Sequence, residues 1–339
     1  MAGQGTGCNA RCPEGDVSHL CFLLVNLAER LECSWSPHTD DNEWSQTTVG
    51  DALSALPNLR ILDLDLKHCK VPIRLDRLTG LNTIVLNNVD YARDSEHILD
   101  AFAKMVAKSP QLTSIDILPV WSYSRQVAPI YSLHQIFKYY PTDIPPLRLH
   151  HLGLNACLLR IDHTTLPHIK HLKSLRLRSF IDPYAAPYDG YEKNPNNGEE
   201  QKKVGSHLDS FWRTMATEGI WLEKIVHQDV GPGFLDYLSS YSGLKALTLT
   251  PDPWYRSLEY SNPMARQFFA NLGPLFRHSQ SLEDLRIDPC YEGDWCVDTY
   301  NVAAISACTN LKEFGMSVLS GQLLRRDTDD DTENGVVSA

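Results

Sequence analysis

The chain has 339 residues, of which 42% are hydrophobic, and it carries a formal net charge of −11. This hydrophobic content is sufficient for a buried core, and an array that grows lengthwise needs no domain boundary at this length. The acidic balance argues against a nucleic-acid-binding or membrane-binding surface, which would need clustered lysine and arginine.

Composition predicts three regions in chain order. Residues 1–18 are rich in glycine, and we expect them to be a disordered N-terminus. Residues 19–326 are expected to form one repeat domain, with a mobile insert at about 184–205 that is rich in Asn, Pro, Gly and charge. Residues 327–339 include the acidic run Asp327–Glu333, whose composition predicts a disordered tail.

The phrase Leu-x-x-Leu-x-Leu recurs about nine times in the central region. Its first leucines lie at 59, 81, 112, 149, 172, 222, 244, 282 and 311, and six of these nine follow a turn-forming pair such as Pro57-Asn58. The gaps between them range from 22 to 50 residues, which fits repeats of about 20–29 residues with insertions. We interpret this as a degenerate leucine-rich-repeat array, with a damaged copy at Leu222/Ile225/His227.

Alternation within each phrase predicts a short strand. In the first copy, Leu62 and Leu64 would point into a shared core, while Asp63 and Asp65 would point outward. Between the strands, helical stripes occur at 98–106 (capped by Asp94-Ser95), at 208–215, and at Phe268, Leu272, Leu275 and Phe276, broken near Gly273-Pro274. The predicted fold class is α/β: a curved, irregular leucine-rich-repeat solenoid with parallel strands on the concave face and helices or loops outside.

The nine cysteines are scattered along the chain. An odd count without regular spacing, in a chain with its own core, favours reduced thiols. Cys21–Ala28 follows acidic residues rather than the positive flank of a signal peptide, and nothing approaches the roughly 20 apolar residues of a membrane span. We therefore expect an intracellular protein, cytoplasmic or nuclear. The alternative is an extracellular repeat receptor, which would contain disulfides.

Catalytic motifs are missing from the sequence. It contains no Gly-x-Ser-x-Gly, no His-Glu-x-x-His and no kinase loop. Five histidines lie between His150 and His171, but no acidic or cysteine partner completes a recognisable ligand spacing. We therefore predict no catalytic, cofactor or metal site. A metal hydrolase that uses this cluster, with His168 and His171 on one face, stays an alternative.

The remaining candidates for function are side chains on the strand surface and in the loops. Those expected to point outward from the strands are acidic in the early repeats and basic in the middle, which suits electrostatic register with a partner: Asp63, Asp65, Asp116, His151, Asn155, Arg176, Arg178 and Arg286. At any single position, a solvated strand face is the simpler interpretation. Exposed loop aromatics could be anchors for a partner or caps over the repeat ends: Trp254, Tyr291 and Trp295.

Two runs resemble fungal F-box/leucine-rich-repeat proteins. They are Leu149-His-His-Leu-Gly-Leu154 with Asp162-His-Thr-Thr-Leu-Pro-His168, and Ser281-Leu-Glu-Asp-Leu285 with Tyr291-Glu-Gly293-x-Trp295 and Leu311-Lys-Glu-Phe314. The resemblance spans most of residues 19–320. It implies an F-box that binds the Skp1 adaptor of a cullin ubiquitin ligase (the SCF complex), and repeats that hold the protein to be ubiquitinated.

Residues 1–18 contain no Leu-Pro-x-x-Leu/Ile phrase of the kind that opens an F-box. We therefore expect either a truncated sequence or a repeat-only relative. The leading hypothesis is a non-catalytic protein-interaction module that resembles the substrate-recognition repeats of F-box ubiquitin-ligase adaptors. A repeat-only scaffold unrelated to ubiquitination is the first alternative.

Overall fold

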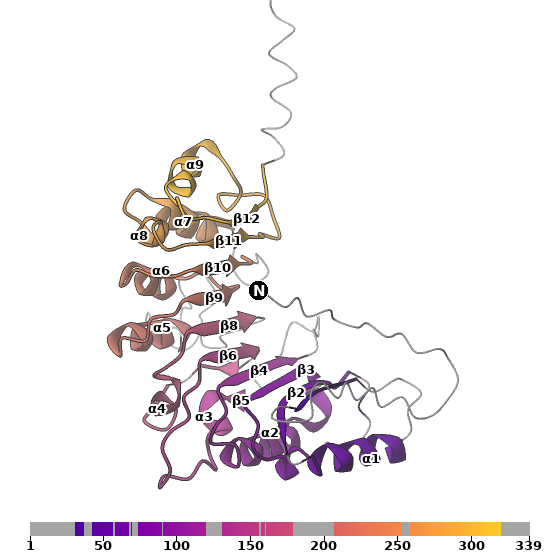
Figure 1. The fold of residues 1–339 in the computed structure, drawn as a ribbon. Helices are drawn as coiled ribbons and strands as arrows, with labels where there is room; N and C mark the ends of the chain where they lie inside the picture. Colours follow the sequence, from indigo (N-terminus) through magenta and orange to yellow (C-terminus); the bar gives the residue numbers. More distant parts are fainter. Residues whose placement is uncertain are drawn as a thin grey trace, which may run out of the picture.

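A computed structural model describes residues 31–36, 43–56, 58–67, 69, 74–89, 91–119, 131–155, 157–159, 161–178, 207–251 and 258–319. Within these ranges, ten strands form one parallel sheet in which neighbouring strands follow chain order (Figure 1). They are β1 (Leu31–Trp35), β2 (Leu59–Asp65), β3 (Thr83–Val89), β4 (Ser114–Pro119), β6 (His151–Asn155), β8 (Ser174–Arg178), β9 (Lys224–His227), β10 (Ala246–Leu249), β11 (Asp284–Ile287) and β12 (Glu313–Met316). A separate pair joins β5 (Tyr131–Ser132) to β7 (Cys157–Leu158).

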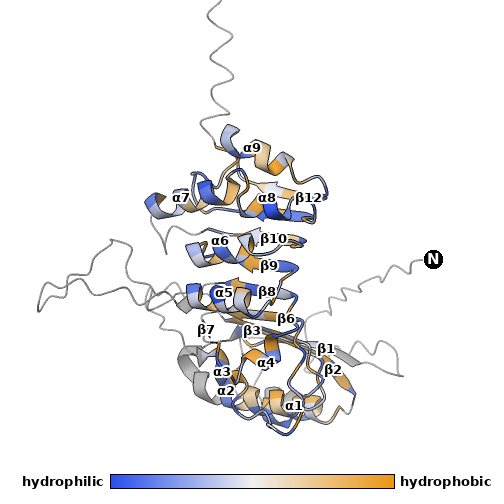
Figure 2. Ribbon diagram, turned by 90° about the vertical axis from the view of Figure 1, so that its left-hand side faces the viewer, coloured by the Kyte–Doolittle hydropathy of each residue, from blue (hydrophilic) through white to orange (hydrophobic). Residues whose placement is uncertain are grey.

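Helices connect the strands, because parallel neighbours need a crossover. They are α1 (Glu43–Ser54), the 3₁₀ turn η1 (Leu75–Arg77), α2 (Tyr91–Ala107), α3 (Leu133–Ile136), α4 (Leu166–Ile169), α5 (His207–Thr217), α6 (Pro232–Ser239), α7 (Leu258–Phe269), α8 (Pro274–His278) and α9 (Thr299–Ser306). Figures 1 and 2 show the helices as a layer along one side of the sheet. No described helix covers the opposite side, which we call the open side. The predicted α/β class with parallel strands is confirmed as an open, solenoid-like array.

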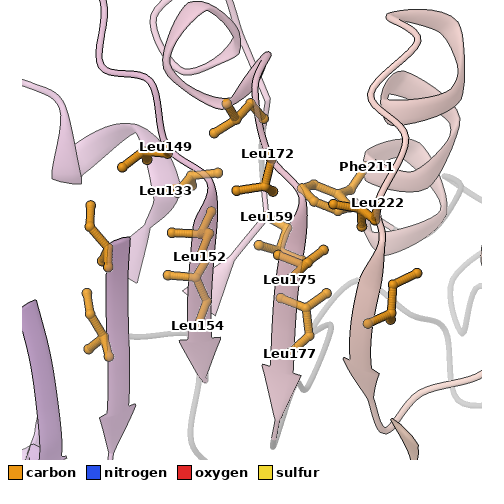
Figure 3. Close-up of a cluster of buried hydrophobic side chains, with 14 of the residues drawn as sticks. Leu133, Leu149, Leu152, Leu154, Leu159, Leu172, Leu175, Leu177, Phe211 and Leu222 are labelled. Atoms are coloured by element: carbon orange, nitrogen blue, oxygen red, sulfur yellow. The ribbon is translucent and has the colours of Figure 1, made fainter. Parts of the chain in front are cut away.

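The helix side of the sheet is lined by the apolar positions of the repeated phrase. In Figure 3, Leu152 and Leu154 of β6 stand beside Leu175 and Leu177 of β8, and each of the four is at most 1% exposed. Eight of the nine first leucines, such as Leu149, are buried at or just before the start of the strands, and Leu311 of the last unit is partly buried. One strand with its helix cannot cover these side chains alone, so neighbouring units share a continuous core.

Backbone hydrogen bonds fix the register of successive units at the residue after each first leucine. The His150 carbonyl accepts from the N–H groups of Lys173 and Ser174, each at 2.9 Å. The Lys173 carbonyl accepts from those of Glu223 (2.8 Å) and Lys224 (3.0 Å). The same two-donor contact is made by the carbonyls of Asn82, Thr113, Glu223, Lys245 and Glu283. Each bend is therefore held by the next one, which makes this edge of the sheet regular.

Buried polar side chains also join the units. His278 Nδ1 accepts the N–H of Leu244 at 3.3 Å while its Nε2 lies 3.0 Å from the Leu238 carbonyl. His168 Nδ1 accepts the N–H of Leu147 at 3.0 Å, and its ring stacks on Phe137. Burial lowers the pKa of both histidines to about 4, so both rings are neutral near pH 7. A neutral ring can accept a hydrogen bond at Nδ1, and a protonated ring cannot.

The damaged copy of the phrase is a structural unit like the others. His227 of β9 takes the inward position that leucine occupies elsewhere and is fully buried. Its ring packs against Trp212 of α5 (5.4 Å between centroids) and Phe234 of α6 (4.8 Å). Burial lowers the pKa of His227 to about 3. Aromatic packing thus replaces the aliphatic contacts of the other units.

The helical predictions are partly confirmed. The 208–215 stripe forms the buried face of α5, and the 98–106 stripe lies in α2. The predicted cap at Asp94-Ser95 is wrong, because α2 begins earlier, at Tyr91. The third stripe is divided between α7 and α8 as predicted, but Leu272 is 74% exposed and Phe276 is 41% exposed. Leu272 adopts φ 65° in the bend between the two helices, which turns its side chain away from the core.

Within the described ranges, no helix is long and apolar enough to cross a membrane. The predicted disordered termini, 1–18 and 327–339, and the insert at 184–205 lie outside the described residues.

Candidate functional site

The open side of the sheet presents one row of side chains that crosses nine strands. The strand register places these residues side by side, and we call them the outer row: Asp63, Val85, Asp116, Gly153, Arg176, Val226, Thr248, Arg286 and Gly315. The row is acidic at β2 and β4 and basic at β8 and β11. Unlike the inward leucines, its members change from strand to strand.

Asp116 is the centre of a charged cluster in the outer row. Its side chain is only 7% exposed, and its Oδ2 lies 2.9 Å from Arg176 Nη1 and 3.5 Å from His151 Nε2. The other His151 nitrogen, Nδ1, is 2.9 Å from the Ser174 hydroxyl. The structure therefore brings together three of the predicted residues, and adds Ser174.

Gly153 makes this cluster possible. A Cβ atom at Gly153 would lie 1.9 Å from Asp116 Oδ1 and 2.5 Å from its Cγ, so the carboxylate occupies the space of the missing side chain. Asp116 can therefore reach across β6 to Arg176 on β8. Sequence reasoning missed this residue, although a lone glycine inside a strand pattern is a recognised sign of close approach by another group.

The cluster has unused hydrogen-bonding capacity. Asp116 Oδ1 and Arg176 Nε are shielded from solvent, and neither has a hydrogen-bond partner among the described residues. Leaving such a group unpaired costs about 1–3 kcal/mol. The Arg176 side chain is still 31% exposed, so the cluster is accessible from the open side. A partner could therefore contact the exposed part of the Arg176 side chain, whereas Asp116 Oδ1 and Arg176 Nε become reachable only if neighbouring side chains move.

The acidic end of the row is ordered by two asparagines. Asn87 Nδ2 donates to Asp63 at 2.7 Å, and Asn88 Nδ2 donates to Asp65 at 2.8 Å. Burial raises the pKa of Asp63, and the nearby carboxylates of Asp65 and Asp116 raise it further, while the hydrogen bond from Asn87 opposes them. These three carboxylates repel one another, so a cationic group of a partner would relieve that repulsion.

The basic residues differ in how far they are neutralised. Arg178 is exposed and makes no ion pair with any residue that the structure describes. Arg286 pairs with Asp284 at 3.2 Å and with Glu313 on the neighbouring strand. The available positive charge on the open side therefore lies near β8 rather than β11.

The two described loop aromatics, Tyr291 and Trp295, do not form an exposed anchor. Trp295 is fully buried against Phe268 and Phe269, and its Nε1 donates to the Ser261 hydroxyl at 3.0 Å. Tyr291 is partly buried, and its hydroxyl contacts the same serine. The exposure expected for Trp295 is therefore wrong, because its segment folds against α7. The alternative of a cap over the repeat end fits this packing better. Trp254 and the side chain of Asn155 lie outside the described part of the structure.

The histidine cluster does not assemble as the metal-hydrolase alternative requires. His168 is buried in the contacts given above, whereas His171 is exposed, so the two side chains do not share a face. Among the described residues, no group of three His, Cys, Asp or Glu side chains is placed to hold a metal ion.

A second charged feature follows the bends before the strands. In the last five units, from Lys173 to Lys312, the residue after the first leucine alternates between lysine and glutamate. Glu223 lies 3.5 Å from Lys173 and 2.7 Å from Lys245, and Glu283 lies 2.7 Å from Lys312. Sequence reasoning missed this ladder, although its signal is simple: lysine and glutamate alternate at a fixed position of the repeated phrase.

No protein-family model, no curated protein and no solved structure matches this chain.

Proposed function

We propose that this chain is a leucine-rich-repeat protein that binds a partner protein through the open side of its sheet and has no catalytic activity of its own. The observation that carries this proposal is the outer row, in which the buried carboxylate of Asp116 pairs with Arg176, whose side chain is 31% exposed on the open side. The partly exposed Arg176 and the exposed Arg178 give a partner charged groups to pair with on this side. The helix side, by contrast, is occupied by the core.

Charge order along the sheet defines the kind of partner surface that fits. Asp63 and Asp65 lie at one end, and Arg176 and Arg178 lie several strands further along. A partner with basic groups opposite β2 and acidic groups opposite β8 would bind in one orientation only, because sliding it along the row would bring like charges together.

The resemblance to fungal F-box/leucine-rich-repeat proteins supports a further proposal. In it, the open side holds a protein to be ubiquitinated, and the chain works with Skp1 and a cullin in the SCF complex. We place the protein in the cytoplasm or nucleus, because its nine scattered cysteines fit reduced thiols.

Affinity purification of the tagged chain from its own host, combined with proximity labelling, tests both proposals. We expect specific partner proteins, with Skp1 and cullin among them. Specific partners without Skp1 and cullin would leave a repeat-only scaffold and reject the ubiquitin-ligase role. Recovery of no specific partner would contradict the interaction function itself.

A further inference from the structure

A hollow of about 350 Å³ lies at the edge of the sheet where the strands begin, away from the outer row. It spans three successive bends: His150 precedes β6, Lys170–Lys173 joins α4 to β8, and Gly219–Trp221 joins α5 to β9. Its lining consists of His150, Lys170, His171, Leu172, Lys173, Gly219 and Trp221. The hollow thus begins where the alternating charge ladder ends, at Lys173.

The charged residues that line the hollow are basic, although the chain as a whole is acidic. The chain as a whole carries −11, yet the hollow has two lysines and two histidines and no acidic residue. Lys170, His150 and His171 are exposed and make no ion pair with the described residues. Lys173 lies 3.5 Å from Glu223, which is itself bonded more closely to Lys245 at 2.7 Å. Two lysines therefore line one small concave space, and their positive charge is only partly neutralised by the described residues.

Trp221 adds an apolar wall to this basic site. It is 38% exposed, and its ring is stacked on the buried Tyr241 (5.1 Å between centroids, 17° between planes), which holds it in place. Gly219, at φ 65°, keeps the space in front of Trp221 open, since the nearest atom to a Cβ there would be Trp221 Nε1 at 4.0 Å. The indole offers a flat apolar surface and an N–H donor beside the lysines.

The floor of the hollow is preorganised. The Lys173 and Glu223 N–H groups bind the carbonyls of His150 and Lys173, so the three bends are joined by the hydrogen bonds that set the strand register. A ligand that binds here need not order the backbone first, which lowers the entropic cost of binding.

We propose that this hollow binds an acidic segment of a partner protein, with carboxylates paired to Lys170 and Lys173 and a neighbouring side chain packed on Trp221. An extended polyanion such as nucleic acid would be repelled by the acidic remainder of the chain. This surface is separate from the outer row, so either surface can be tested while the other is intact.

The test measures binding of a fluorescein-labelled polyglutamate peptide to the whole chain by fluorescence anisotropy at low ionic strength. A polyglutamine peptide of equal length is the neutral control. Lys170→Gln/Lys173→Gln is compared with Lys67→Gln/Lys312→Gln, which removes the same charge from exposed lysines outside the hollow. Trp221→Leu probes the apolar wall, and circular dichroism checks that each variant is folded.

We expect polyglutamate to bind and polyglutamine not to bind. The hollow variant should bind about tenfold more weakly, which corresponds to the loss of two partly exposed ion pairs, and the control variant should bind like the wild type. Trp221→Leu should weaken binding by a smaller factor. Equal losses in the two lysine variants, or no binding of polyglutamate to the wild type, would overturn the proposal. Competition by inorganic phosphate at concentrations where glutamate has no effect would also overturn it, in favour of a small-anion site.

Discussion

The two sides of this sheet differ in how much their residues vary from strand to strand. On the helix side, seven of the strands from β2 to β11 present leucine or isoleucine pairs, and these are almost completely buried. On the open side, the outer row changes from Asp to Val, Gly, Arg and Thr between adjacent strands. A shared core forces similar residues on every unit, and no such requirement acts on the open side. The repeated core positions therefore specify the fold, and under the proposed function the variable open side would specify the partner.

The contrast is not simply between buried and exposed. Asp116 and Val226 are less than 9% exposed although they belong to the outer row. Part of the open side is therefore packed, and a substitution there can affect stability as well as binding. The predictions below separate the two effects.

Substituting two adjacent residues of β2 gives the most direct comparison of the helix side with the open side of the sheet. Leu62→Ala should lower the free energy of unfolding by about 2–5 kcal/mol, because Leu62 is fully buried in the shared core. Ile61→Ala, on the open side of the same strand, should cost roughly 1 kcal/mol, because Ile61 is only partly buried. Urea unfolding followed by circular dichroism measures both. Equal losses would mean that the two sides are packed alike.

Lowering the pH should destabilise the folded chain, because it protonates histidines that are buried in the core. The pKa values of His168 and His278 are lowered to about 4 in the folded chain, against about 6.5 when unfolded. The unfolded chain therefore binds more protons between pH 6.5 and 4, and stability falls as the pH falls through this window. At pH 5 the loss should be on the order of 2 kcal/mol for each histidine.

Urea unfolding at pH 7.5 and pH 5 checks this sign and size. His278→Gln keeps a carbonyl that can accept the Leu244 N–H but removes the titrating group, so it should reduce the pH dependence. An unchanged pH dependence in this variant would show that His278 does not contribute to it.

Gly153→Ala tests whether the open side is packed at its centre. The added Cβ would collide with the Asp116 carboxylate, so we expect a loss of about 1–3 kcal/mol of stability. In an Asp116→Ala background the same change should cost much less, because the colliding group is gone. A double-mutant cycle measures this coupling. Additive losses would show that the carboxylate does not lie over Gly153.

Much of the fold could be predicted from the sequence because the leucine phrase reports the core directly. Leu62, Leu152 and Leu175 all lie at their expected inward positions. The site was harder, because it depends on contacts between strands. Asp116 and Arg176 are far apart in the sequence, and only the register brings them together across Gly153.

For Trp295 the sequence-based prediction of an exposed side chain is wrong. Its segment is rich in polar and turn-forming residues, which suggests an exposed loop, but the segment folds onto α7. The fully buried Asn301 holds it there by donating from Nδ2 to the Cys296 carbonyl at 2.8 Å. Composition alone does not reveal a contact of this kind.

One charge-reversal pair tests the central claim that partners bind the open side. Arg178→Glu changes an exposed residue of β8 on that side, and Arg213→Glu makes the same change on an exposed residue of helix α5. Quantitative mass spectrometry of proteins that co-purify with each variant is the measurement. The account predicts that Arg178→Glu weakens retention of the partners by about tenfold or more, and that Arg213→Glu retains them as the wild type does. Full retention by Arg178→Glu together with loss in Arg213→Glu would place the binding surface on the helices and contradict the account.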